Sequence, residues 1–453
     1  MSLTHLIFCI SFFILHCSLF STKAPTDEAA QSKTELLLDL SNYDNLRAFN
    51  LALEDFALEC SSSRKNNGVD VISRATFAEA LVTKLDLAMA DGTAPFNADV
   101  VTYNTLMKVW SRAAQTLADG RGRGDINAVI HGMDDIPEEL TRGGIYTAKD
   151  AADRALVIMN EVEQKYLNGE SAIAPNPFGY NIVLDGLSKS HARDAPDKVE
   201  ELFNRMRKWS REGVPAPVDA SGEEGEEHVN GDVSKWQHIR PDAISYSIVM
   251  ETLGQSKEYG VMSRVEDLLK DLEACYEKSG DEELKPVTRV ANSAINSYLR
   301  NSGGQMRHKT SNNQAWQNAK KVHDILNDLN AKWKETGDAS YQPDITTITM
   351  VIDSYGRCTD VAATERGEFL FEKIFKKWQD SGDDKLKPSS KTFTVVSNFT
   401  FVYDICTYII PLPFSNNAAL LFPIDDQFMG KNMGHKVARK GRRLAQAYGS
   451  NVC

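Results

Sequence analysis

The polar residues that recur at matching positions in this sequence are small amides and hydroxyls. They are Asn50, Asn104, Asn181, Ser247, Asn292, Thr349 and Thr394. A side chain of this kind can donate or accept a hydrogen bond, so it can distinguish a donor from an acceptor on a ligand. The chemistry that these residues suggest is recognition by hydrogen bonds.

Residues that could catalyse a reaction or hold a metal form no comparable pattern. The seven cysteines include no Cys-x-x-Cys pair, which argues against a zinc site or a disulfide framework and for reduced, mostly buried thiols. The "GRGRG" stretch at Gly120 follows no strand pattern, so it does not indicate a phosphate loop. We interpret His191, His308 and His323 as solvated helix or loop residues. The sequence predicts no enzyme activity, no metal and no cofactor.

Length and charge limit the architecture and the partners. A chain of 453 residues is too long for one compact core, so several domains or a repeat array are expected. The net charge of −12 is unusual for a nucleic-acid binder, although the acidic stretch "GEEGEEHVNGD" contributes part of it. Among the basic residues, a group on predicted second helices is assigned to a solvated outer face: Arg205, Arg207, Lys208, Lys376 and Lys377.

Alignment on Tyr103 and Asn104 reveals the elements that must position the recurring polar residues. Seven copies of one stretch begin at Leu46, Val100, Pro177, Ala243, Thr288, Ile345 and Ser390. In the first six copies the fourth, seventh, eighth and eleventh residues are apolar or aromatic, which is the spacing of one face of a helix. The small polar residue is always the fifth. Since packing does not require a polar residue there, we expect this position to face a ligand.

A second helix with the same apolar spacing follows each of the first six copies. One example is the face formed by Val199, Leu202, Phe203 and Met206. A proline in "APN", "RPD", "KPV", "QPD" or "KPS" then precedes a new first helix, where the neighbouring Asp, Asn or Ser can cap it. Neither helix of a pair can bury its apolar stripe alone. The sequence therefore predicts an all-α fold, an α-solenoid (superhelix) of stacked helix-turn-helix repeats with long loop insertions.

The predicted repeat array covers residues 46–395, with about six units and a partial seventh. Insertions are expected near 118–148, 210–239 and 301–314, the second being rich in proline, glycine and acid and typical of a disordered loop. From about Val396 the helical pattern fails. Residues 396–453 are interpreted as a non-repeat tail, native or the product of an imperfect gene model.

The N-terminal residues 1–22 resemble a signal or targeting segment, and residues 23–45 a linker. The apolar run from Leu6 to Phe20 is short for a membrane span and suits the core of a signal peptide, although no Lys or Arg precedes it. A misassigned start codon is the alternative. We expect no stable membrane span in the mature chain.

The repeated unit resembles the pentatricopeptide repeat family, as "DVVTYNTLMKVWSRAA" and "RPDAISYSIVMETLGQS" show. The tetratricopeptide pattern W-x2-L-G-x2-Y does not recur. Successive fifth positions lie 45 to 77 residues apart, beyond the roughly 35 of a standard unit, as in long-unit variants of the algal and stramenopile type.

The resemblance implies recognition of single-stranded RNA at one base per repeat, with each base read by the fifth residue of a unit and the last residue before the next. The implied pairs are Asn50 with Asp99, Asn104 with Asn176, Asn181 with Asp242, Ser247 with Val287, Asn292 with Asp344, and Thr349 with Ser389. Base stacking falls to the second residue of each unit: Arg47, Val101, Phe178, Ile244, Arg289, Thr346 and Lys391. Asn with Asp resembles the uracil-preferring combination, so the implied site is roughly U-pyrimidine-U-any-U-any, and Val287 makes one unit blind.

The resemblance also implies a role in processing, stabilising or translating organellar RNA, together with protein partners in an RNA-processing complex. The expected location is a plastid reached through the signal-like N-terminus, with the mitochondrion as the alternative. A scaffold for protein–protein interaction, with no RNA contact, is the competing function.

Overall fold

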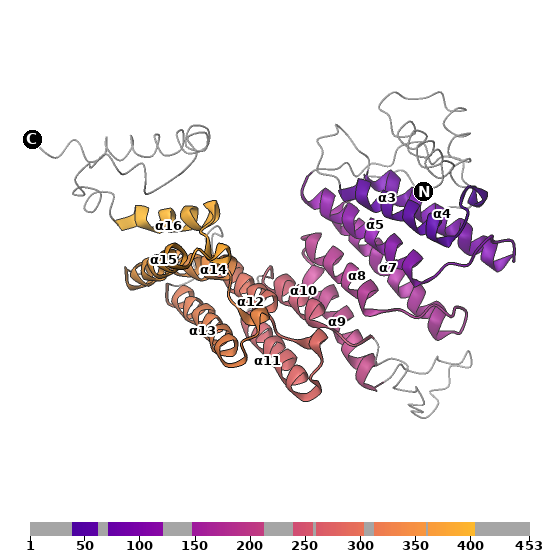
Figure 1. The fold of residues 1–453 in the computed structure, drawn as a ribbon. Coiled ribbons are helices and arrows are strands. Elements are labelled where there is room, and N and C mark those ends of the chain that lie inside the picture. Colours follow the sequence, from indigo (N-terminus) through magenta and orange to yellow (C-terminus); the bar gives the residue numbers. More distant parts are fainter. Residues whose placement is uncertain are drawn as a thin grey trace, which may run out of the picture. The chain divides into compact units, whose positions relative to one another are not determined.

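The computed structural model describes residues 39–61, 71–120, 147–212, 239–256, 260–302, 312–358 and 361–403 (Figure 1). Within these ranges the chain forms thirteen α-helices, several short 3-10 turns and no strand, so the predicted all-α class is confirmed. The chain divides into two compact units, Met1–Thr392 and Phe393–Cys453, and the described residues of the second end at Tyr403. The predicted targeting segment and most of each predicted insertion lie outside the described residues.

The seven copies found in the sequence are the first helices of successive pairs. They are α3 (Leu46–Ser61), α5 (Val100–Ala118), α8 (Pro177–Lys189), α10 (Ala243–Leu253), α12 (Thr288–Asn301), α14 (Ile345–Gly356) and α16 (Ser390–Tyr403). Each begins at the residue where its copy was predicted to begin. The last helix differs from the prediction at its other end, because it continues past Val396 to Tyr403.

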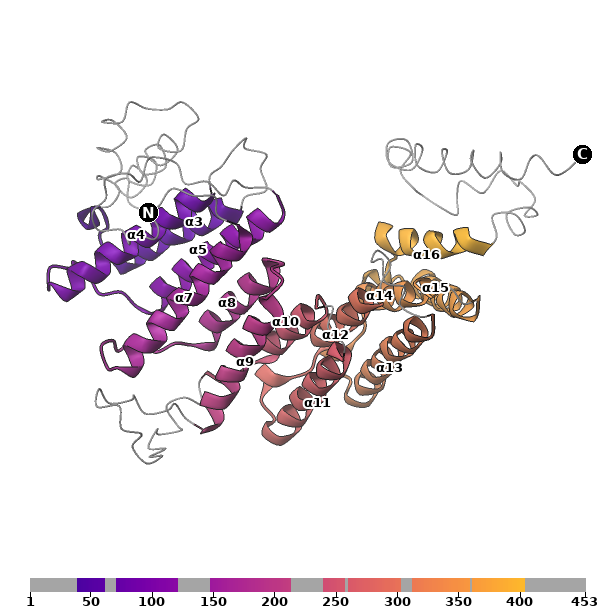
Figure 2. The same ribbon diagram turned by 180° about the vertical axis from the view of Figure 1, so that it is seen from behind.

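A second helix follows each of the first six, as predicted. These are α4 (Val71–Ala90), α7 (Ala148–Leu167), α9 (Ala195–Glu212), α11 (Val261–Ser279), α13 (Asn312–Thr336) and α15 (Val361–Ser381). Each first helix from α3 to α12 contacts the next first helix, and each second helix from α4 to α13 packs against the first helices on both sides of it in sequence. In Figures 1 and 2, α9, α11 and α13 accordingly lie on one side of α8, α10 and α12.

In three of the later helix pairs, the segment between the second helix and the next first helix forms an ordered turn. After α11, α13 and α15, a glycine with positive φ is followed by an aspartate whose side chain accepts a backbone N–H of a 3-10 turn. The turns are Glu282–Leu284, Ala339–Tyr341 and Asp384–Leu386, and each buries one side chain, Leu284, Tyr341 or Leu386. Glycine suits the left-handed residue because it has no Cβ. The turn therefore ends the second helix and covers the core before the proline that precedes the next first helix.

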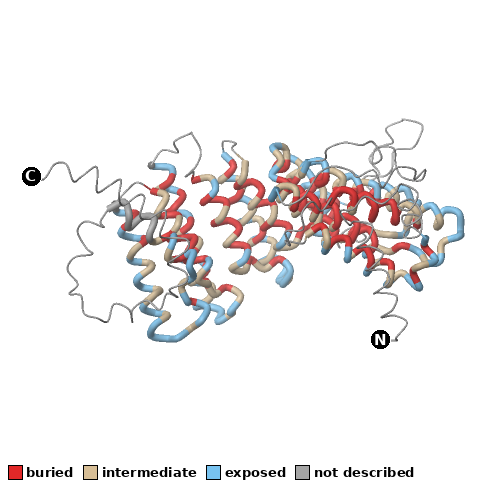
Figure 3. Tube along the Cα trace, turned by 90° about the horizontal axis from the view of Figure 1, so that it is seen from above, coloured by how far each residue is buried: buried red, intermediate tan, exposed pale blue. Residues whose placement is uncertain are grey.

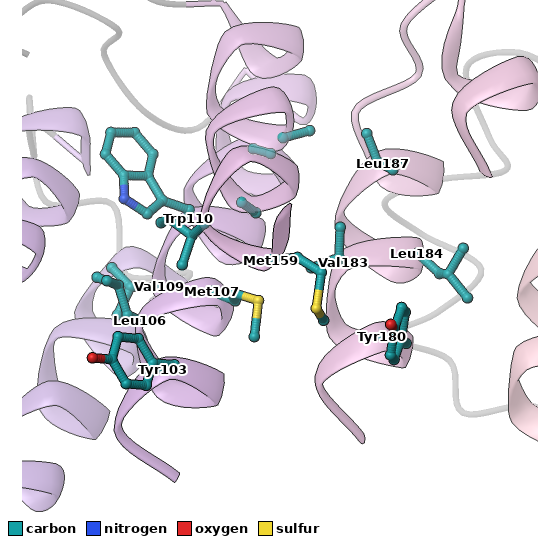
Figure 4. Packing of buried hydrophobic residues seen from close by; sticks show 14 of the residues in the cluster. Tyr103, Leu106, Met107, Val109, Trp110, Met159, Tyr180, Val183, Leu184 and Leu187 are labelled. Atoms are coloured by element: carbon teal, nitrogen blue, oxygen red, sulfur yellow. The ribbon is translucent and has the colours of Figure 1, made fainter. Parts of the chain in front are cut away.

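The apolar faces predicted from the spacing are buried or half-buried, and those from α3 to α11 share one core, while Ala291, Leu329 and Tyr341 form a separate cluster. Buried residues from Leu40 to Ala294 belong to one cluster (Figure 3). Met107 of α5 and Met159 of α7 lie between the Trp110 side of the cluster and the row that begins at Tyr180 (Figure 4). Leu40 and Tyr43, within the predicted linker, are also buried in this core.

First helices approach closely where a glycine faces a serine. A Cβ on Gly186 of α8 would lie 2.5 Å from Ser111 Oγ and 3.1 Å from Ser111 Cα. Ser111 Oγ donates a hydrogen bond to the Ile182 carbonyl at 3.1 Å. Gly254 and Ser297 repeat the arrangement between α10 and α12, with Ser297 Oγ donating to the Met250 carbonyl. The missing Cβ allows the two backbones to approach one another.

Tyrosines of the first helices donate hydrogen bonds to carboxylates of the second helices, and a basic residue of a neighbouring second helix pairs with the same carboxylate. The clusters are Tyr103–Asp86–Lys165, Tyr180–Glu163–Arg205, Tyr246–Asp271–Arg207 and Tyr298–Glu266–Lys321. Arg205 and Arg207 thus make ion pairs, so the prediction of a simply solvated outer face is wrong for these two residues. Lys208, Lys376 and Lys377 are exposed, as predicted.

The residue directly before the first apolar face position of a second helix is basic in five successive pairs. Four of these cations pair with a carboxylate on the preceding second helix: Arg154 with Glu79, Lys198 with Asp153, Arg264 with Glu200, and Lys321 with Glu266. The fifth is Arg366 of α15. These ion pairs join second helices that make few backbone contacts with each other.

In the part of the chain that the structure describes, no helix is both long enough and apolar enough to cross a membrane.

Replacing Tyr180 by Phe is expected to lower the free energy of unfolding by about 1–3 kcal/mol. Glu163 is 1% exposed at its side chain, and the variant removes the 2.5 Å hydrogen bond that Tyr180 donates to it. Burial raises the pKa of Glu163 above 4.5, while the Arg205 charge and the Tyr180 hydrogen bond oppose this. Losing Tyr180 raises the pKa of Glu163 further, so the loss of stability should be larger at pH 7 than at pH 4.5. Urea unfolding followed by circular dichroism at both pH values measures it.

Tyr298→Phe is the matched control, because its acceptor Glu266 is 30% exposed at the side chain and water can replace the hydroxyl. Its effect should be smaller and should change less between pH 7 and pH 4.5, because the pKa of Glu266 is lowered from 4.5 rather than raised. Equal effects of the two variants would contradict a role for burial.

Candidate functional site

The structure brings the first three predicted residue pairs into direct contact. Asn50 Nδ2 donates to Asp99 Oδ1 at 3.2 Å, and Asn104 Nδ2 donates to Asn176 Oδ1 at 3.1 Å. Asn181 Nδ2 lies 3.1 Å from both carboxylate oxygens of Asp242. Residues 49 to 72 positions apart are thus joined between successive first helices.

The second member of these pairs is the N-cap of the next first helix. The side chains of Asp99, Asn176, Asp242 and Asp344 each accept the backbone N–H three residues further on. A helix leaves its first N–H groups without a partner in the helix, so an Asp or Asn at this position stabilises the helix start. The fifth residue of one first helix therefore binds the side chain that caps the next.

Hydroxyls at the third position complete the network, and the sequence analysis did not single them out. Thr102 donates to Asn50 Oδ1 at 2.8 Å, Ser245 to Asn181 Oδ1 at 2.6 Å, and Thr347 to Asn292 Oδ1 at 2.8 Å. All three residues are fully buried. The signal was present in the sequence as Asp-x-x-Thr or Asp-x-x-Ser, the spacing of a capping box. In α8 this position is Gly179, where a Cβ would lie 2.5 Å from Asn104 Oδ1.

The other three pairs are connected differently. Ser247 donates to the Ala243 carbonyl of its own helix, and Val287 is an N-cap without a side-chain hydrogen bond. Asn292 and Asp344 both accept from Thr347. Thr349 lies 2.8 Å from the Thr392 hydroxyl, which is 3.0 Å from Ser389 Oγ.

The fifth position has a structural role that the sequence analysis did not predict. Asn104 is 5% exposed and Asn181 is 9% exposed, while Asn50 and Asn292 are half-buried. The expectation that packing does not require a polar residue here is wrong, because the amide satisfies a cap and a hydroxyl of the neighbouring helix. Only part of its hydrogen-bonding capacity remains for a ligand.

The second position lies on the surface in every copy. All seven residues assigned to stacking are exposed: Arg47, Val101, Phe178, Ile244, Arg289, Thr346 and Lys391. Phe178, Val101 and Ile244 are 61%, 48% and 41% exposed, and they occupy the first turns of three consecutive first helices. The first turns of α5, α8 and α10 thus carry large apolar side chains that the core does not use.

A hollow of about 410 Å³ lies between α3 and α5, where these features meet. Its lining includes the second-position residues Arg47 and Val101 and the hydrogen-bonded pair Asn50 and Asp99. The hollow therefore brings a guanidinium and an aliphatic side chain together with an amide and a carboxylate. The arrangement can bind and discriminate a small planar group.

No family model matches this chain, and no curated protein matches it. Within the described residues, no three His, Cys, Asp or Glu side chains gather in a way that could hold a metal ion. His191 is exposed, as predicted, and His308 lies outside the described residues. His323 differs from the prediction: it is half-buried and lies 2.9 Å from the Tyr355 hydroxyl.

Asn181→Ala is expected to cost about 1–3 kcal/mol of unfolding free energy, because it leaves the Asp242 carboxylate and the buried Ser245 hydroxyl without their shared partner. Phe178→Ala, three residues away on the exposed side, is the control and should change stability by less than about 0.5 kcal/mol. The measurement is the urea midpoint of each full-length variant. A neutral Asn181→Ala would contradict the structural role of the network.

Proposed function

We propose that this chain is an α-solenoid of pentatricopeptide-like helix pairs that binds single-stranded RNA through the first turns of its first helices. In this proposal it acts with protein partners in processing, stabilising or translating organellar RNA. The observation that carries the proposal is the hollow between α3 and α5, where two second-position residues flank a hydrogen-bonding pair.

The exposed second position supports the stacking part of the proposal. Stacking needs flat or aliphatic surfaces and planar cations that are accessible to solvent and spaced along a groove. Phe178, Val101 and Ile244 meet this need, and Arg47 and Arg289 add guanidinium groups at the same position of other units.

The hydrogen-bond network supports base reading mainly by the half-buried cap residues. Asp242 Oδ1 accepts from Ser245 and Asn181, whereas Oδ2 accepts only from the Asn181 amide. Oδ2 can therefore accept one more bond, and the amide nitrogen has a second hydrogen. A donor beside an acceptor complements the N3–H and carbonyl edge of uracil, in agreement with the preference implied by Asn with Asp.

Phe178→Ala is expected to weaken binding to a fluorescent oligouridine of about 15 nucleotides by about 1–3 kcal/mol, or roughly 5- to 150-fold in Kd. Phe369→Ala is the matched control, since Phe369 is a 67% exposed phenylalanine on a second helix and its loss should leave Kd unchanged. Fluorescence anisotropy at low salt measures both, with thermal melts to check folding. Absence of binding to any single-stranded RNA pool, or equal effects of the two variants, contradicts the proposal and favours the protein scaffold.

Binding should depend only weakly on salt, because the second-position row carries few cations. With about three phosphate contacts, from Arg47, Arg289 and Lys391, log Kobs against log salt should have a slope of about −2. Anisotropy titrations between about 50 and 200 mM KCl measure the slope. A value beyond about −5 would require a basic track elsewhere.

The cellular compartment of the protein determines which RNAs are available for it to bind. A fluorescent fusion of the full chain should collect in the plastid, or in the mitochondrion under the alternative. Fluorescence confined to the secretory lumen or the cytosol would overturn the organellar part of the proposal while leaving RNA binding to the anisotropy test.

A further inference from the structure

The junction between α13 and α15 departs from the ion-pair pattern of the other second helices. At the preceding junction, Lys321 and Lys332 of α13 pair with Glu266 and Glu273 of α11. The basic residues recur one unit later as Arg366 and Lys377 of α15, at the same offsets from the first apolar face residue. Both of these residues are exposed.

The carboxylates do not recur. The positions of Glu266 and Glu273 are taken on α13 by His323 and Asn330. His323 contacts Tyr355 at 2.9 Å, as Glu266 contacts Tyr298, so the side chain keeps its place while the negative charge is lost. Burial, followed by the positive charges of Arg366 and Lys373, lowers the pKa of His323 despite the opposing Asp324, so the ring is neutral at pH 7.

Within the described residues, Arg366 and Lys377 have aromatic neighbours and no carboxylate within ion-pair distance. The Arg366 guanidinium lies over Trp316 at 5.0 Å, and the Lys377 ammonium lies over Trp333 at 5.6 Å. At each earlier junction the cation at the position of Arg366 is neutralised inside the chain. Here it faces solvent.

A groove of about 1050 Å³ occupies this junction. Five exposed cations line it: Lys320, Lys334, Arg366, Lys373 and Lys377. Asp324 and Glu365 are the two carboxylates in its lining, so the groove is basic in a chain of net charge −12. The floor is apolar and includes Leu370 and Ile374, which are only half-buried on the last second helix.

We propose that this groove binds an acidic amphipathic helix of a partner protein, whose carboxylates supply the charges that His323 and Asn330 do not. The lining runs from Lys320 to Lys334 along α13, or about 21 Å at 1.5 Å per residue, which is the length of four helical turns. An apolar stripe on the partner covers Leu370, Ile374 and the 67% exposed Phe369. Carboxylates seven residues apart, like Glu266 and Glu273, face Arg366 and Lys377.

A helix fits these observations better than a nucleic-acid strand. Within the described residues, the cation at the position of Arg366 is paired with a carboxylate at each of the four earlier second-helix junctions, so a strand that left the groove along the second helices would meet neutralised surface. The lining combines branched aliphatic side chains such as Leu370 and Ile374 with the aromatic side chains of Trp333, Tyr355 and Phe369, and the aliphatic part suits a leucine-rich stripe more than it suits stacked bases. This inference does not depend on RNA binding by the first helices.

The test uses the full-length protein and a fluorescein-labelled synthetic helix of about 16 residues, with leucines on one face and glutamates seven positions apart, chosen to span about four turns. Saturable binding at low salt is expected by anisotropy. The double variant R366E/K377E should weaken it by at least about tenfold. Lys376→Glu is the matched control, because Lys376 is exposed on the same helix but does not line the groove, and it should leave Kd within about twofold.

A second variant adds negative charge on α13 instead of reversing the positive charge on α15. H323E/N330E restores the acids found on α11 and should abolish peptide binding while the melting temperature stays the same or rises, which distinguishes occupancy from misfolding. Four results would overturn the proposal: no saturable binding, equal binding of a peptide with Gln for both Glu, continued binding to H323E/N330E, or release of the peptide by stoichiometric oligouridine. The last would identify a nucleic-acid site.

Discussion

The hydrogen bond between the fifth residue of one first helix and the capping side chain of the next is the interaction on which the first helices from α3 to α10 depend. A helix start needs partners for its exposed N–H groups, and a buried amide needs partners for its own donors and acceptor. Asn181, Asp242 and Ser245 meet both needs in one cluster. Because the cluster joins residues of two helices, it also sets where along its length each helix meets its neighbour.

This constraint divides the first turn between two tasks. In the first six copies the third and fifth positions are buried or half-buried and hold successive helices together, whereas the second position is exposed in every copy. A residue such as Phe178 can therefore change without disturbing the network, and Asn181 cannot. Substitution of the fifth position tests stability and ligand binding together, so the exposed row separates the two more cleanly.

The second helices show why the overall charge is a poor guide to binding. Many acids of the chain are internal partners, as with Glu79 beside Arg154 and Glu163 beside Arg205 and Tyr180. Such acids contribute to the net charge without repelling a ligand on another face. At the last junction neutral residues replace them, and the local surface becomes basic although the chain remains acidic.

The sequence by itself determined the all-α class and the stretches that form the seven first helices, and the family resemblance named three residue pairs that are in direct contact between them. Apolar spacing indicates which face of a helix is buried, and prolines indicate where the chain reverses. Both patterns can be recognised within the sequence of a single helix and its ends. Only the tertiary structure decided that the paired amides hold neighbouring helices together and are only partly accessible to a ligand. It also decided that Arg205 and Arg207 are neutralised by ion pairs, and that His323 takes the place of a carboxylate. Those outcomes depend on hydrogen bonds and charges contributed by helices distant in sequence. The sequence of one helix does not show which residues of another helix it will contact.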